Sequence, residues 1–202
     1  FTGIDSDSGV REVQTVNISG FTGGSLTFGF GPVNLPLPGY VSVVHGASFV
    51  TTSVDLTAYI IRGDLISIGG NVYEVGSVGT LNDKQIPLNT SYVGVNDDSV
   101  EIYRQHTSQP VSLPASSTDV EGVLHNTFSV GSVSVRVNAT SRSEAVWEVT
   151  FQSNTGPQPA FFINRHQLQG VGSVSVMTTT SGVNPGYYHY CKCPFFLLLI
   201  FT

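Results

Sequence analysis

The sequence is short of charge, and of positive charge above all. Lysine and arginine total 8 and aspartate and glutamate total 14 among 202 residues, which gives a net charge of −6. Two of the basic residues are lysines, Lys84 and Lys192. A nucleic-acid-binding surface needs clustered lysine and arginine, so we expect no nucleic-acid partner. Helix bundles and coiled coils, which need many charged helix-forming residues, are disfavoured as well.

Long apolar runs are scarce too. The longest is the seven-residue segment Phe195–Phe201, which follows Pro194. A membrane-spanning helix needs about 20 apolar residues, so we expect no stable membrane span. Three interpretations of the segment stay open: a buried final strand, a strand that binds another subunit, or a truncated anchor or misread end of the coding sequence. Because the chain starts at Phe1 instead of methionine, we expect a processed form or a fragment.

Cysteine and the motifs of catalysis are nearly absent. The two cysteines, Cys191 and Cys193, are separated by one residue, and a disulfide between them would be strained. No HExxH or GxSxG motif occurs, and no glycine-rich loop opens a helix. The five histidines are scattered without metal-ligand spacing: His45, His106, His125, His166 and His189. We therefore expect no enzyme, no catalytic residue, no metal and no cofactor.

The chain is rich in segments in which apolar and polar residues alternate. Valine, serine, threonine and glycine dominate, and such sequences favour strands joined by tight turns. Gln14–Ser19 and Ser25–Phe30 predict a hairpin around the glycine-rich residues 20–24. Val133–Asn138 and Trp147–Gln152 predict a second hairpin. The expected fold class is all-β.

One short helix and two further strands complete the predicted sandwich. Thr118 and Glu121 have the spacing of a capping box, and the apolar residues after them predict a helix over about 119–126. Ala160–Ile163 and Ser173–Thr179 predict strands. The core between two sheets is predicted to contain seven residues: Leu26, Phe28, Val133, Val135, Trp147, Val149 and Phe151.

The middle of the chain predicts a separate module. A proline-rich connector, Asn34–Tyr40, and the junction Gln109–Pro110 enclose short strands with turn signals between them. They predict a small β-barrel inserted into the sandwich, an arrangement that is tolerated when the two ends of an insert lie close together. The predicted organisation is an N-terminal arm, donor-type strand and first hairpin over 1–32, the inserted barrel over 33–109, the rest of the sandwich over 110–186 and an apolar tail over 187–202.

Three segments of the outer part carry a family resemblance. Glu12–Val16, Ser116–Leu124 and Val146–Phe151, the last with Asn154 and Gly156, resemble an Ig-like β-sandwich module. That module is repeated in very large secreted and cell-surface proteins of stramenopile algae and oomycetes. The resemblance therefore implies an Ig-like sandwich and an extracellular or cell-surface location.

The inserted part resembles a companion β-module of the same proteins, through Asp64–Val75 and Ile86–Tyr92. The nested arrangement also resembles protomers of extracellular pilus-like fibrils, in which the N-terminal strand of one subunit completes the sandwich of another. The similarity covers residues 11–180 in pieces and does not include the tail after Gly186. It implies architecture and location, and it carries over no catalytic residue.

This resemblance makes Arg11–Ser19 a candidate donor strand. A glycine-, aspartate- and serine-rich arm precedes the segment and a glycine-rich turn follows it, so the segment is expected to be free to swing outward. Val13, Val16 and Ile18 are the residues expected to contact the acceptor subunit. The alternative is an ordinary first strand that pairs with Leu26–Phe30 of the same chain.

Three sequons and one tripeptide are the remaining surface motifs. Asn17, Asn89 and Asn138 each stand two positions before a serine or threonine. Asn17 and Asn138 fall on the polar phase of their strands, so both are predicted to carry N-glycans in a eukaryote, with Asn89 the weaker candidate. The integrin-type tripeptide at 62–64 is interpreted as a turn that leads into the next strand.

These observations favour a structural subunit of an extracellular helical fibril or surface appendage. Its partners would be identical subunits joined by strand exchange, with glycans as possible additions. The alternative is an adhesive or carbohydrate-binding pair of modules from a long cell-surface protein. A fibre subunit should form polymers with helical order, whereas a module cut from a long chain should be monomeric.

Overall fold

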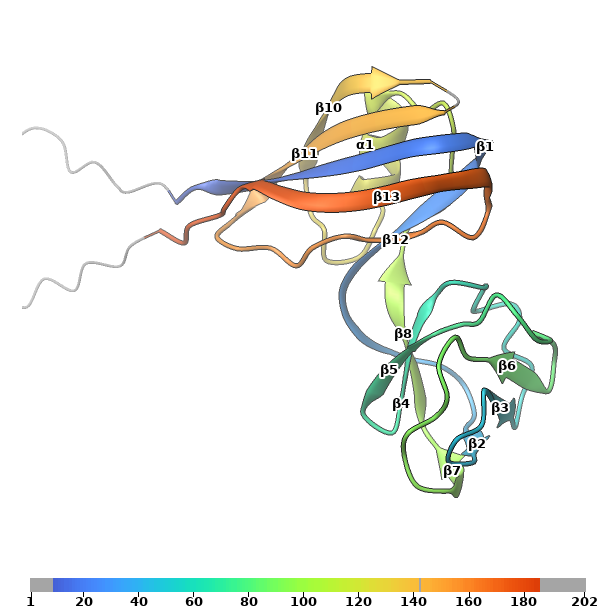
Figure 1. Ribbon diagram of the computed structural model, residues 1–202. Helices are drawn as coiled ribbons and strands as arrows, with labels where there is room; N and C mark the ends of the chain where they lie inside the picture. The colour runs from blue at the N-terminus through green and yellow to red at the C-terminus, as the bar shows by residue number, and fades with distance from the viewer. Residues whose placement is uncertain (1–8, 142, 186–202) are drawn as a thin grey trace, which may run out of the picture.

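The structure is a computed structural model that describes residues 9–141 and 143–185. Within these residues the predicted all-β fold is confirmed, because thirteen strands and one short helix form a sandwich and an inserted module (Figure 1). The elements are β1 Arg11–Pro36, β2 Val41–Val43, β3 Phe49–Thr52, β4 Leu65–Ile68, β5 Asn71–Glu74, β6 Gln85–Pro87, β7 Asp97–Val100, β8 Ile102–Thr107, β9 Val111–Ser112, α1 Ser117–His125, β10 Val133–Thr140, β11 Glu144–Thr155, β12 Phe162–Asn164 and β13 Leu168–Thr180.

Strand β1 is continuous and bent, so the hairpin expected around residues 20–24 does not form. Gly20, Gly23 and Gly24 have positive φ angles of 84°, 142° and 98°, which bend the strand without reversing it. The first half of β1 pairs with β11 on one side and β13 on the other, and the second half pairs with β9, β12 and β8. The bend therefore folds the sheet over itself.

The side chains between the two halves of this folded sheet form the sandwich core. All seven residues predicted for the core lie in one buried cluster. Trp147 is fully buried, and its ring centroid lies 6.1 Å from that of Phe28. Phe30 stacks on Phe151 at 5.6 Å, and Phe161 packs against both of these rings. The predicted second hairpin is confirmed by the antiparallel pairing of β10 with β11.

Helix α1 starts slightly earlier than predicted, with a different capping box. Ser116 is the N-cap, and its hydroxyl accepts a hydrogen bond from Asp119 N at 3.2 Å. The Asp119 carboxylate accepts one in return from Ser116 N at 2.9 Å. The predicted pair, Thr118 and Glu121, has the same spacing but lies inside the helix. Glu121 is therefore available for a contact outside it.

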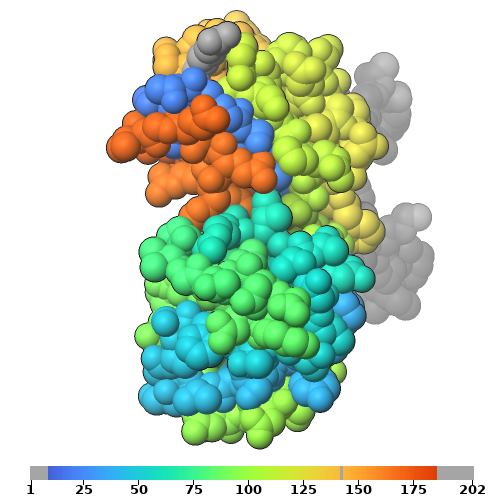
Figure 2. Space-filling view, turned by 90° about the vertical axis from the view of Figure 1, so that its right-hand side faces the viewer, coloured from blue at the N-terminus to red at the C-terminus, as the bar shows by residue number. Residues whose placement is uncertain are grey.

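The insert has its own core, separate from that of the sandwich. Strand β4 pairs with β5 on one side and β8 on the other, and β6, β3, β2 and β7 form a second small sheet. Their buried side chains form a cluster that runs from Leu37 to Ile102. Residues 29–36 of β1 pair with 103–107 of β8 in a ribbon that connects the two modules. Figure 2 shows the insert, in cyan and green, as a lobe below the sandwich.

Candidate functional site

Strand β13 is an open edge of the sandwich. It is 13 residues long and pairs with β1 on one side, and no other described strand pairs with it. It contains no charged residue and no proline. Natural sheets usually protect long edges with charge, proline, bulges or a covering element, because free main-chain groups recruit further strands. In Figure 2 the β13 residues, in orange, form the left margin of the sandwich above the insert.

The opposite edge of the same sheet, β10, is closed by helix α1. The carboxylate of Glu121 accepts a hydrogen bond from Val135 N at 3.1 Å. The Nε2 atom of His125 lies 3.1 Å from Val133 N and 2.9 Å from Val133 O, so it satisfies one of these groups in either protonation state. Arg136 adds a charge on the strand itself. The β10 edge thus has a covering helix and a charged residue, neither of which β13 has in the described part of the chain, although the pairing of β13 with β1 contains irregularities.

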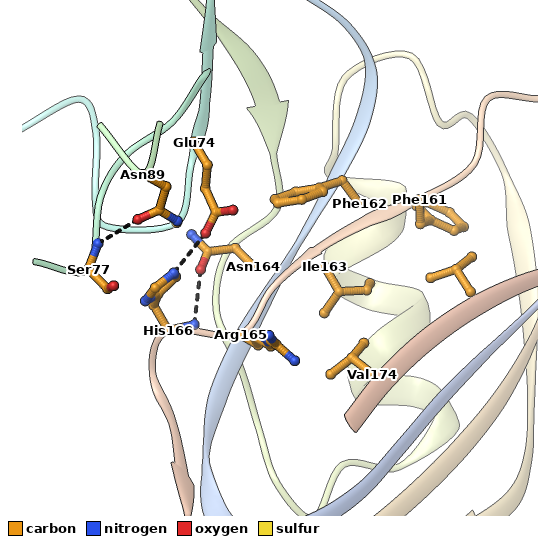
Figure 3. Close-up of a pocket in the computed structure, with 12 residues that line it drawn as sticks. Glu74, Ser77, Asn89, Phe161, Phe162, Ile163, Asn164, Arg165, His166 and Val174 are labelled. Carbon is orange, nitrogen blue, oxygen red and sulfur yellow. Dashed lines mark hydrogen bonds and ion pairs between the residues drawn. The ribbon is translucent and has the colours of Figure 1, made fainter. Parts of the chain in front are cut away.

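A cavity of about 600 Å³ lies beside β13 (Figure 3). On the sandwich side its wall is apolar and consists of Phe161, Ile163, Val174 and Val176. Phe161 and Ile163 are members of the sandwich core, and Val174 and Val176 pack against that core from the edge strand. The cavity therefore lies along the seam between the edge strand and the segment 161–164, where apolar core side chains border solvent.

The other end of the cavity is polar and joins the two modules. His166 Nε2 lies 2.9 Å from a carboxylate oxygen of Glu74, so the sandwich and the insert are linked by an ion pair when the histidine is protonated. Asn164 donates from Nδ2 to Arg62 O at 3.0 Å and to the Asp64 carboxylate at 2.9 Å. These contacts fix the insert to the segment that forms one wall of the cavity.

The integrin-type tripeptide lies in this junction and is not presented to solvent as a loop. Gly63 has a φ of 83°, which favours glycine, and a Cβ on it would collide with the His166 ring. Burial raises the pKa of the Asp64 carboxyl, and hydrogen bonds from Ile61 N and Asn164 offset part of that increase. The tripeptide thus leads into β4 as predicted, and its aspartate holds the modules together.

The candidate donor strand lies in the middle of its own sheet. Residues 13–19 pair with β11 on one side and with β13 on the other. Val16 and Ile18 are fully buried in the sandwich core, whereas Val13 is half-buried on the opposite face. The prediction that this segment lies in a neighbouring subunit is therefore corrected, and so is the alternative pairing with Leu26–Phe30. The glycines that follow bend the strand instead of releasing it.

Two buried polar side chains strengthen this placement. Gln14 is fully buried, donates to Pro159 O at 2.9 Å and accepts from Phe161 N at 3.0 Å. Glu12 accepts from Gln158 N at 2.9 Å and from the Gln14 amide at 2.7 Å. Removing this strand would leave these groups unpaired in the sandwich, so the segment is an integral part of the domain.

The three predicted glycosylation sites are exposed. Asn17 is exposed on the outer face of β1, and Asn138 is exposed at an irregularity of β10 between Val137 and Ala139. Asn89 borders the cavity, and its side-chain oxygen accepts a hydrogen bond from Ser77 N at 3.0 Å. A glycan on Asn89 would have to share this space with any molecule in the cavity, whereas Asn17 and Asn138 face solvent.

The sequence predicted no metal site and no membrane span. Residues 9–141 and 143–185 contain no group of three or more histidine, cysteine, aspartate or glutamate side chains that could hold a metal ion. None of the helices in those ranges is long and apolar enough to cross a membrane. Cys191, Cys193 and the apolar run Phe195–Phe201 lie outside the described residues.

The open edge and the cavity were not predicted as a site. The sequence carried one signal for the edge, the absence of charge and proline throughout 168–180, which is unusual for an exposed strand. Nothing local in the sequence places Glu74 beside His166, because the contact joins residues 92 positions apart. Comparison of the chain with protein-family models, curated proteins and solved structures found no match.

Proposed function

We propose that this protein is a structural subunit of an extracellular fibre or surface appendage, in which a strand of one subunit pairs with β13 of the next. The observation that carries the proposal is the contrast between the edges of one sheet. Strand β10 is covered by side chains of α1, and β13 has free main-chain groups along an apolar seam. A free edge beside an apolar wall is the arrangement that accepts an added strand.

Assembly through β13 would use two different surfaces of each subunit, one that accepts a strand and one that donates it. The accepting surface, β13 with the seam, differs from whatever strand is donated, so the contact is heterologous. Heterologous contacts generate rings or open helical filaments, depending on the rotation between subunits. A fibre is therefore the expected product of repeated strand addition.

An extracellular location is supported by the outward position of two sequons. Asn17 and Asn138 are both exposed, and neither lines the cavity. Glycans there would leave the β13 seam accessible. Mass spectrometry of the protein from its natural source should find both asparagines modified, and finding both unmodified would argue against this location in a eukaryote.

A second candidate function, an adhesive or carbohydrate-binding module, is favoured by the polar end of the cavity. Glu74, Asn89, Arg165 and His166 gather there next to the half-buried ring of Phe162. Carboxylate, amide and aromatic groups together are suited to small polar ligands such as sugars. This function requires no polymer, so the oligomeric state separates the two candidates.

The test is the assembly state of the full chain, measured by sedimentation velocity and electron microscopy. The unmodified chain should form polymers with helical order. The double variant Val171→Lys/Ser175→Lys, which places two charges on the exposed β13 edge, should remain monomeric. The matched control Ser134→Lys, on the outer face of β10, should polymerise normally. Monomers of the unmodified chain at all concentrations would refute the fibre function.

A further inference from the structure

We infer that the strand added to β13 is the apolar segment Phe195–Phe201 of a neighbouring subunit, an inference that rests on the proposed fibre function. The segment lies outside the described residues, so its sequence is the starting point. It contains seven apolar residues and no charge. Phenylalanine and isoleucine favour strands, and as a strand it would be apolar on both faces.

The acceptor fits such a strand in length and chemistry. Seven extended residues span about 23 Å, and the 13 residues of β13 span about 43 Å, so the segment can pair along its whole length. One face of the added strand would contact Val174, Val176, Phe161 and Ile163, which are the apolar wall of the cavity. Burying this apolar surface would drive the association of the subunits. Hydrogen bonds to the free main-chain groups of β13 would align the added strand along the edge.

The last described residues extend the sheet beyond the end of β13. Val183 and Val10 exchange hydrogen bonds of 2.8 and 2.9 Å, which extends the alignment of β13 with β1 beyond Thr180. The last described residues thus continue outward, away from the cavity, and the two described ends leave the sandwich side by side (Figure 1). A neighbouring subunit is the acceptor that the proposed fibre function requires.

The first experiment alters the donor in the full chain. Leu197→Asp/Leu198→Asp places one charge on each face of the segment, so one charge faces the seam whichever face is buried. Because burying unpaired charges is unfavourable, this variant should weaken subunit association by about 100-fold or more in sedimentation velocity. The control Tyr187→Asp/Tyr188→Asp adds the same charge outside the segment and should assemble like the unmodified chain.

The second experiment locates the contact. Full chains carrying a photo-crosslinking phenylalanine analogue at position 195 or 201 are assembled from equal amounts of light and ¹⁵N-labelled protein. Cross-links should join light to heavy chains and fall within residues 161–176. Cross-links within single chains, or to the insert, would overturn the inference. If the Leu197→Asp/Leu198→Asp variant forms unchanged polymers while Val171→Lys/Ser175→Lys does not, the donor is wrong but the fibre function stands. If the unmodified chain never polymerises, the fibre function itself is refuted.

Discussion

The two edges of the sandwich sheet differ in how their main-chain groups are satisfied. On β10, the amide groups of Val133 and Val135 face α1 and bond to His125 and Glu121. On β13, the corresponding side of the strand faces the seam, where the described chain provides a cavity in place of a covering element. Both strands belong to one sheet and pack on the same core. The two edges therefore differ in the elements that cover their outer main-chain groups.

This difference shows how one fold can be closed to assembly at one edge and open at the other. One turn of α1 is enough to protect the start of β10, because the side chains of His125 and Glu121 bond to main-chain groups of Val133 and Val135. Strand β13 follows the bend of β1, and the bend separates it from the segment 161–164. The following changes test this comparison, from the largest expected effect to the smallest.

The core under both edges should be the most sensitive part. Trp147→Ala removes a fully buried ring that packs on Phe28. The substitution should lower the free energy of unfolding by about 3–5 kcal/mol, the usual range for truncating a large buried aromatic. Chemical denaturation measures this free energy. A loss below about 1 kcal/mol would show that the Trp147 ring does not support the sheet whose edges are β10 and β13.

Removing the contact between α1 and β10 should have the next largest effect on the free energy of unfolding. Glu121→Ala leaves Val135 N without its acceptor, so the free energy of unfolding should fall by about 1–3 kcal/mol. Glu121→Gln keeps an acceptor oxygen and should retain most of the stability. Equal losses for the two variants in denaturant titrations would mean that the contact does not protect β10.

Destabilising the N-terminus of α1 should affect β10 less than the loss of the Glu121 contact does. Ser116→Ala removes the N-cap acceptor of Asp119 N, and losing such a cap costs about 1 kcal/mol. Ser116→Thr, which keeps the hydroxyl, is the matched control. Amide hydrogen exchange should speed up in α1 and at Val135, and protection that stays at its original level would contradict the coupling of helix to edge.

Acid should loosen the same helix. Hydrogen bonds from the Ser116 hydroxyl and main-chain N–H lower the pKa of Asp119 below its usual value of 3.8. Its ionised form is therefore favoured in the folded state, and the stability it contributes is present above about pH 4 and lost as the pH falls through the lowered pKa. Asp119→Asn should abolish this part of the pH dependence. Identical acid denaturation curves for the variant and the unmodified chain would rule the effect out.

The open edge should tolerate charge with almost no loss of stability. Ser175 is exposed on β13, so Ser175→Lys should change the free energy of unfolding by less than about 0.5 kcal/mol. The same substitution is expected to reduce assembly, which separates folding from association. A loss above about 1 kcal/mol would show that this edge is already part of a packed structure.

Much of the sandwich follows from its sequence because the alternating pattern is local. The pairing of β10 with β11 is visible in the alternation of Val133, Val135, Trp147 and Val149, and all of these residues lie in the core. The same alternation predicted the outward positions of Asn17 and Asn138. Periodicity decides which side of a strand is apolar, and this information is carried by each segment alone.

Periodicity could not decide which strands become neighbours. Gly20–Gly24 has the composition of a hairpin turn, yet the structure uses it as a bend, because β11 and β13 already occupy both sides of the first half of β1. Likewise, Thr118 and Glu121 have the spacing of a capping box, but Ser116 and Asp119 form it. Each local pattern fits two geometries, and packing selects one.

The sequence by itself determined the all-β class, the core residues and the low charge of β13, since these depend on residue type and spacing. Only the tertiary structure decided that β10 is covered, that β13 is free, and that a cavity lies beside β13. These features depend on contacts between distant segments, such as Glu121 with Val135 and His166 with Glu74. Free main-chain groups are common to every strand, so an open edge exists only where the packed neighbours leave it uncovered.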